Sequence, residues 1–167
     1  MENTKQAPIT IGAEEGQSLS IAGNSYRILV SGSETGGDFA TIDMLVPPGG
    51  GPGPHSHAHF HETFYVMEGE VEIHSEVSVY TAKMGDYVVI PKGGIIHYFK
   101  NKTDKNVRLL CTVIPSGLEE MFIAISKEIS NGQLSPSPDS QGLKQMQQIA
   151  EKYGQQFYPP DYLGSNS

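Results

Sequence analysis

Residues 49–62 read GGGPGPHSHAHFHE and hold four of the six histidines in the chain. The histidines occupy every second position from 55 to 61, and the segment ends on Glu62. Alternate side chains of an extended chain point to the same side, so the four imidazoles would share one face. Neutral imidazole is the commonest side-chain metal ligand. Histidines concentrated beside a carboxylate therefore indicate a metal site rather than a solvated loop with incidental histidines.

The residues after this segment predict an apolar environment for Glu62. Glu62, Phe64 and Val66 lie on the same face of a strand-like run, and Phe64 and Val66 suit a barrel interior. An unpaired buried carboxylate costs several kcal/mol of free energy or stays protonated. A metal ion would remove this cost. A salt bridge would also do so, but no Lys or Arg lies nearby in the sequence.

His97 is a candidate fourth ligand. It follows the run GDYVVIPKGGII, residues 85–96. A histidine after an apolar run is commonly a packed core residue, but a buried imidazole needs a hydrogen-bond partner or a ligand. The single cysteine, Cys111, lies on a later predicted strand, where we expect it to be part of the core.

The spacing in the histidine-rich segment resembles the first motif of the cupins, G(X)5HXH(X)3–4E(X)6G. The positions that fit are Gly49, His55, His57, Glu62 and Gly69.

The second cupin motif, G(X)5PXG(X)2H(X)3N, also has a counterpart. Gly85, Pro91, Gly93, His97 and Asn101 follow it, with one extra residue between Gly93 and His97. The C-terminal part, with a helix that ends at residues 152–154 and an aromatic tail, is more loosely similar to small bacterial single-domain cupins described as quercetin-dioxygenase-like.

This resemblance implies an all-β fold, a cupin β-barrel of the double-stranded β-helix or jelly-roll type. It also implies one divalent metal ion bound by three histidines and a glutamate, which here are His55, His57, Glu62 and His97. His59 and His61 would not be ligands by this comparison, although chain order alone also permits His57 and His59 with Glu62. Fe, Mn, Ni, Co, Cu and Zn all accept such nitrogen and oxygen ligands.

The remaining pattern predicts many short strands followed by one or two C-terminal helices. We expect strands at 26–30, 39–46, 63–67, 71–74, 87–90 and 107–114, and a tight turn at Gly69. Apolar spacing predicts helices over 118–129 and 143–153, with Ser116 as N-cap and Glu119 as its partner. We divide the chain into N-terminal strands or an arm (1–37), the barrel core (38–115) and C-terminal helices with a tail (116–167).

Composition limits the partners. The net charge is −8 and no basic stripe is present, which argues against nucleic acid. No run of about 18 apolar residues and no secretory signal is found, so we expect a cytoplasmic protein away from the membrane. The aromatic tail, residues 157–162, would pack either on its own barrel or on a second subunit. Together with Ile9 and Ile11 it leads us to expect a homodimer.

The resemblance favours a metal-dependent dioxygenase, an oxidoreductase acting on an aromatic or flavonol-like small molecule. Glu62 could also act as a catalytic base on a substrate hydroxyl. The apolar residues expected near the substrate are Phe60, Phe64, Ile96 and Phe99. Two alternatives remain open: an isomerase of a small sugar or keto acid, and a non-catalytic metal-binding or small-molecule-binding protein.

Overall fold

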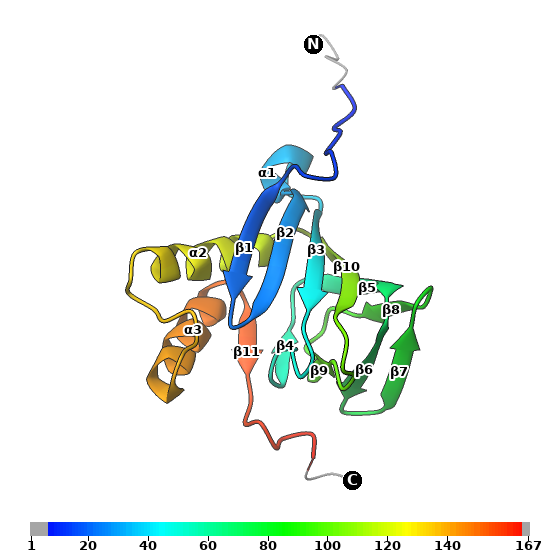
Figure 1. Ribbon diagram of the computed structural model, residues 1–167, viewed down its shortest axis with the longest axis vertical. Helices are drawn as coiled ribbons and strands as arrows, with labels where there is room; N and C mark the ends of the chain where they lie inside the picture. The colour runs from blue at the N-terminus through cyan, green and yellow to red at the C-terminus, as the bar shows by residue number, and fades with distance from the viewer. Residues whose placement is uncertain (1–6, 165–167) are drawn as a thin grey trace.

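The structure is a computed structural model that describes residues 7–164. Its strands form two antiparallel sheets in the jelly-roll arrangement of the expected β-barrel class (Figure 1). The six-stranded sheet has the order β1 (Gln17–Ile21), β2 (Asn24–Val30), β3 (Ala40–Val46), β10 (Val107–Ile114), β5 (His61–Glu68) and β8 (Tyr87–Ile90). The five-stranded sheet has the order β11 (Gln155–Phe157), β4 (His55–His57), β9 (His97–Lys100), β6 (Glu70–Ser75) and β7 (Val79–Lys83).

The core lies between the sheets because alternate side chains of the central strands point inward. In β10 every second residue is fully buried, and in β5 Glu62, Phe64 and Val66 are buried together. The prediction that Glu62 shares an inward face of β5 with Phe64 and Val66 is therefore confirmed. Glu62 lies in the apolar interior.

All six expected strands are present, with ends shifted by up to two residues. The predicted helices correspond to α2 (Leu118–Ser130) and α3 (Ser140–Lys152). Sequence patterns missed the one-turn helix α1 (Gly32–Thr35) and five strands, β1, β4, β7, β9 and β11. Three of these strands have only three or four residues, too few for alternation to be recognised. No described helix has both the length and the apolar character required to span a bilayer.

The start of α2 differs from the prediction. Its N-cap is Gly117 rather than Ser116, whose hydroxyl donates to the carbonyl of Gly37 at 3.1 Å. The buried Glu119 carboxylate accepts from the Gly117 amide and from the distant Gly32 amide, both at 2.8 Å. Glu119 thus joins the first turns of α1 and α2, a tertiary contact that overrides the local capping pattern.

The C-terminal segment crosses from one sheet to the other. The helix α2 lies beside β1, α3 packs against α2 and β11, and β11 pairs with β4 of the second sheet (Figure 1). The amide of Tyr158 donates to the carbonyl of Pro54 at 2.9 Å. Residues 155–158 therefore pack on their own chain, which is the first of the two alternatives considered for the tail.

Candidate metal centre

Four buried side chains converge between the sheets: His55 and His57 from β4, His97 from β9 and Glu62 from β5. One ligand atom from each lies within 4.8 Å of the others. His55 pairs directly with His97 across β4 and β9, whereas Glu62 comes from the opposite sheet. Each of the four is at most 4% exposed, so water does not solvate the cluster freely.

The three imidazole rings are oriented by backbone carbonyls. The Nδ1 atoms of His55, His57 and His97 lie 2.9, 3.1 and 3.0 Å from the carbonyl oxygens of residues 53, 60 and 95. A carbonyl oxygen can only accept, so each Nδ1 carries the proton. In the neutral ring, Nε2 is then the atom with a free lone pair. Such second contacts orient metal-binding histidines.

The free nitrogens face the Glu62 carboxylate. Nε2 of His57 lies 3.1 Å from Glu62 Oε2, and Nε2 of His97 lies 3.3 Å from the same oxygen. Lone pairs on neutral imidazoles and a carboxylate repel at this distance, unless a cation lies among them. Three nitrogens and one anionic oxygen form a donor set that suits a divalent ion. The chemistry of these four residues therefore fits a metal ion.

Burial controls the protonation of the cluster. Burial, and then the neighbouring His97, lowers the pKa of His55 to about 4, which keeps this ring neutral near pH 7. Burial alone would raise the pKa of Glu62, but the rings of His57 and His97 outweigh it and hold that pKa below its ordinary value. Glu62 is thus an anion beside the neutral ring of His55.

Cys111 contacts the other oxygen of this carboxylate. Its Sγ lies 3.6 Å from Glu62 Oε1, within the range of a thiol donor. Burial, and then the charge of Glu62, raises the pKa of Cys111 well above its ordinary value. Cys111 therefore remains a thiol and donates to Oε1, while Oε2 faces the histidines. Cys111 lies in the core, as expected, but it also contacts the cluster, which no sequence pattern indicated.

The other two histidines of the segment lie outside the cluster. The expectation that all four share one face is wrong, because the chain bends at residues 58–59 between β4 and β5. His59 is exposed, and Nδ1 of His61 accepts from the Lys92 amide at 3.3 Å. The residue between them, Phe60, stacks on the His57 ring with centroids 4.1 Å apart.

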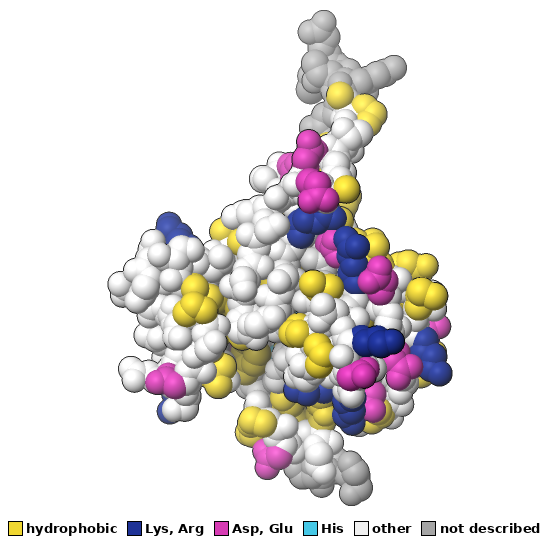
Figure 2. Space-filling model, viewed as in Figure 1, with side chains coloured by type: hydrophobic (Ala, Val, Ile, Leu, Met, Phe, Trp, Pro, Cys, Tyr) yellow, Lys and Arg dark blue, Asp and Glu magenta, His cyan; other side chains and the backbone are white. Residues whose placement is uncertain are grey.

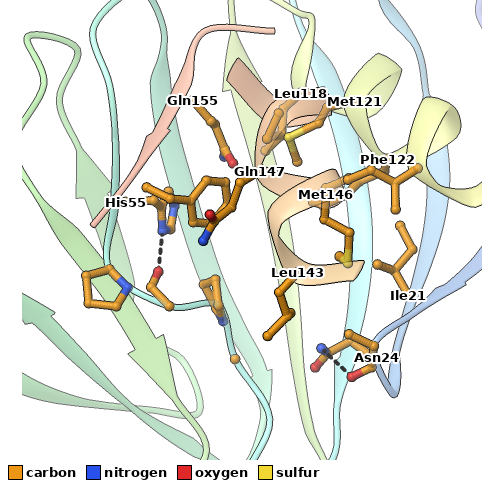
Figure 3. Close-up of a pocket in the computed structure, with 18 of the residues that line it drawn as sticks. Ile21, Asn24, His55, Leu118, Met121, Phe122, Leu143, Met146, Gln147 and Gln155 are labelled. Carbon is orange, nitrogen blue, oxygen red and sulfur yellow. Dashed lines mark hydrogen bonds between the residues drawn. The ribbon is translucent and has the colours of Figure 1, made fainter. Parts of the chain in front are cut away.

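A cavity of about 320 Å³ leads from the cluster toward the C-terminal helices (Figure 3). His55 and Glu62 contribute to its lining at one end. Most of the remaining lining is apolar and comes from β1, β3, α2 and α3: Ile21, Met44, Leu118, Met121, Phe122, Ile125, Leu143 and Met146. Among residues 7–164, no Lys or Arg lines the cavity. Four apolar residues were expected near the substrate: Phe60, Phe64, Ile96 and Phe99. Of these, only Phe99 lines the cavity.

Residues 42–113 match the family model of the cupin domain, Cupin_2. These residues form a cupin domain. A search of the curated proteins found no match to the chain.

Solved structures with the same fold carry diverse names. A predicted oxalate decarboxylase from Thermotoga maritima is 21% identical, with a TM-score of 0.57 over 64% of this chain and 99% of that one. A cupin-superfamily sugar phosphate isomerase from Silicibacter pomeroyi is 20% identical, with a TM-score of 0.57 over 65% and 77%. The polyketide cyclase RemF from Streptomyces resistomycificus is 18% identical, with a TM-score of 0.56 over 66% and 81%. Similarity at this level shows the fold alone.

The cupin domain contains all four cluster residues, whereas much of the cavity lining lies outside it. Tyr26 from β2 shows this division. Its ring stacks on Phe122 of α2 with centroids 4.4 Å apart, and both rings line the cavity. Sequence reasoning missed Tyr26 because nothing near it in the chain suggests a site. The part of the cavity lining that could have been predicted comes from the two helices, whose apolar spacing was recognised in the sequence.

Proposed function

We propose that this protein binds one divalent metal ion through His55, His57, Glu62 and His97 and acts as a dioxygenase-type oxidoreductase on a neutral aromatic, flavonol-like compound. The observation that carries the proposal is the apolar cavity that reaches His55 and Glu62, in whose lining the described part of the chain places no Lys or Arg. Pockets of this kind bury a ligand largely through apolar contact, with a few polar groups that set its orientation.

The ion would supply Lewis acidity and, where it is redox-active, reactivity toward O₂. The chain itself holds the donors in place: three backbone carbonyls orient the rings, and Cys111 directs the Glu62 carboxylate. Few of these contacts need to rearrange on binding.

Glu62 is the catalytic base of this proposal. Its carboxylate lines the cavity, so a substrate hydroxyl can approach it and transfer a proton to it. The surrounding apolar side chains exclude water from that contact.

The lining argues against the isomerase alternative. A small sugar or a keto acid requires polar or cationic side chains around its hydroxyls or its carboxylate, in addition to the metal ion. Away from His55 and Glu62, the lining of the cavity is mostly apolar. The non-catalytic alternative predicts metal and ligand binding without O₂ consumption, so the activity test separates it from the dioxygenase.

Metal analysis of purified variants tests the ligand set. We expect His55→Ala, His57→Ala and His97→Ala each to lose most of the bound metal, because three remaining donors hold the ion weakly. His59→Ala is the matched control and should keep its metal. Metal loss in His59→Ala but not in His55→Ala would show that the ligand assignment is shifted along the segment.

An oxygen electrode tests the activity. Protein loaded with Fe, Mn, Ni, Co or Cu should consume O₂ in the presence of 3-hydroxyflavone. Glu62→Gln should retain more metal than any of the His→Ala variants and lose turnover by about 100-fold or more, since the amide cannot act as a base. Metal-loaded protein that binds the flavonol without O₂ uptake would overturn the dioxygenase and support the binding protein.

A further inference from the structure

The end of the cavity away from His55 contains an unpartnered polar atom. Asn24, the first residue of β2, lines the cavity and is only 7% exposed. Its Oδ1 is the one buried side-chain nitrogen or oxygen among residues 7–164 without a hydrogen-bond partner. Figure 3 shows Asn24 beside Ile21 and Leu143, with His55 on the other side of the cavity. Buried polar atoms are nearly always paired, so this exception needs a physical reason.

The orientation of the Asn24 amide follows from its neighbour. The Nδ2 group lies 3.5 Å from the carbonyl oxygen of Ala22, and no other hydrogen bond of this side chain is found within the described residues. A carbonyl accepts but does not donate, so Nδ2 must be the atom on that side. The free atom is therefore the oxygen, which is an acceptor.

The backbone around Asn24 is constrained. Ala22 and Gly23 form the turn between β1 and β2 with φ values of +48° and +83°, as in a two-residue hairpin of type I′. On the other side, a Cβ built on Gly50 would come within 2.8 Å of Asn24 Oδ1. The turn and the glycine together hold the amide at the end of the cavity, where the neighbouring side chains Ile21, Leu143 and Met146 offer no donor.

We propose that Asn24 Oδ1 is the acceptor of a distal subsite that binds a hydroxyl or N–H group of the ligand. The ligand class is a neutral apolar ring system with a hydrogen-bond donor at the end away from Glu62. The inference rests on the proposed function for the ligand's aromatic character and its orientation toward the metal centre, but not for the acceptor itself.

Ligand-free protein provides the first test. Asn24→Leu replaces the unpaired oxygen by an apolar side chain among apolar neighbours, so we expect its melting temperature to rise by about 2–4 °C. A melting temperature that falls would show that Oδ1 is already satisfied, and would overturn the subsite. If Asn24→Leu does not fold, Asn24→Ala removes the same acceptor and is used in both tests.

Binding of two probes of similar size provides the second test. Metal-loaded protein under nitrogen is titrated with 2,6-dihydroxynaphthalene, which carries a donor at each end, and with 2-naphthol, whose single hydroxyl can bind at the Glu62 end. We expect wild type to prefer 2,6-dihydroxynaphthalene by about tenfold, and Asn24→Leu to reduce this preference to about twofold or less. Met146→Leu is the control, because it changes the same cavity without removing a polar atom, and should keep the preference.

The outcomes separate this inference from the proposed function. A preference for 2,6-dihydroxynaphthalene that persists in Asn24→Leu overturns the subsite, whatever the protein does with O₂. A preference that depends on Asn24 supports the subsite even where no O₂ is consumed, and then only the dioxygenase fails. Absence of binding by both probes contradicts the apolar substrate and the subsite together.

Discussion

Cys111 contacts the Glu62 oxygen that the histidines do not, and this gives the cysteine a testable positioning role. Cys111→Val removes the donor at Oε1 and leaves Glu62 free to turn. We expect metal affinity to fall by about tenfold or more, as is usual when a residue that orients a ligand is lost. Competition with a chelator measures the change.

Cys111→Ser is the matched control for that experiment, because a hydroxyl can donate to the same oxygen. We expect Cys111→Ser to retain metal affinity within a few-fold of wild type. Equal losses in the Ser and Val variants would mean that core packing, rather than the hydrogen bond, accounts for the effect.

The candidate site divides into residues that the sequence could predict and residues that it could not. His55, His57 and Glu62 lie within eight positions, so their spacing carries the information directly, and His97 follows from a second spaced motif. Cys111 and Asn24 are different, because each meets the site only through strand pairing over long distances in the chain. A single Asn after a turn, or a Cys in a strand, has no local pattern that signals such a contact.

At the scale of elements, an ion-pair cluster joins three neighbouring strands of the six-stranded sheet. Asp43 of β3 receives hydrogen bonds from Arg27 of β2 at 2.9 Å and from Arg108 of β10 at 2.9 and 2.6 Å. On the face shown in Figure 2, Lys and Arg side chains lie among Asp and Glu rather than in a stripe of their own. The ion-pair cluster therefore links strands of the sheet. The mixed charges on that face do not indicate a binding site for a polyanion.

This cluster predicts a pH dependence of stability. The contact with Arg108 lowers the pKa of Asp43, burial opposes the shift, and Arg27 adds to it. The folded pKa lies below the unfolded value of about 3.9, so the stabilisation is present above about pH 4 and is lost as the pH falls further. Asp43→Asn should lower the free energy of unfolding at pH 7 by about 1–2 kcal/mol and flatten its decline in acid. Urea unfolding between neutral and acidic pH measures both effects. If stability declined in acid as steeply in Asp43→Asn as in wild type, the decline could not be attributed to Asp43.

A substitution in the turn between β5 and β6 should change the stability of the fold without changing metal binding. Gly69 has φ of +78°, and a Cβ there would lie 3.0 Å from Val107 Cγ2. Gly69→Val should therefore lower the melting temperature by about 2–4 °C per kcal/mol of strain. Metal stoichiometry of the folded variant should stay near normal, because Glu62 lies at the other end of β5. Folded Gly69→Val protein without metal would show that this turn also shapes the site.

At the scale of the whole molecule, the tail no longer motivates the expected homodimer, because residues 155–158 pack on their own chain. We propose instead that a second copy covers the exposed apolar side chains of β7, β8 and the adjoining turns: Val77, Val79, Tyr80, Met84, Tyr87 and Val89. Both strands are free edges of their sheets. Free edges and contiguous apolar surface favour association.

Light scattering coupled to size exclusion tests this proposal. We expect a dimer at micromolar concentration for wild type, and a shift toward monomer for Val89→Lys, which places a charge on that surface. Leu45→Lys is the control on β3, where Leu45 is similarly exposed but lies away from β7 and β8. A monomeric wild type would contradict the dimer, and equal dissociation by both variants would contradict its location.

The barrel class could be predicted from the sequence because two short spaced motifs and six strand-like runs all indicate it. The cavity could not, because its lining joins three distant parts of the chain, residues 21–26, 118–150 and 155–160, to the strands that hold the metal-site residues. Helical periodicity identified the apolar faces of α2 and α3. It could not show that these faces cover an open space rather than solid core.

The pairing of β11 with β4 has a consequence for the order in which the protein is made. The strand that bears His55 and His57 is completed on one side by residues 155–157, which a ribosome adds about a hundred positions later. At about 5–20 residues per second, the histidines wait on the order of 5–20 s for this neighbour. At the start of that interval the future cavity lacks α2, α3 and β11. Metal acquired then would enter an open site, whereas metal acquired afterwards would have to pass through the cavity that these elements line.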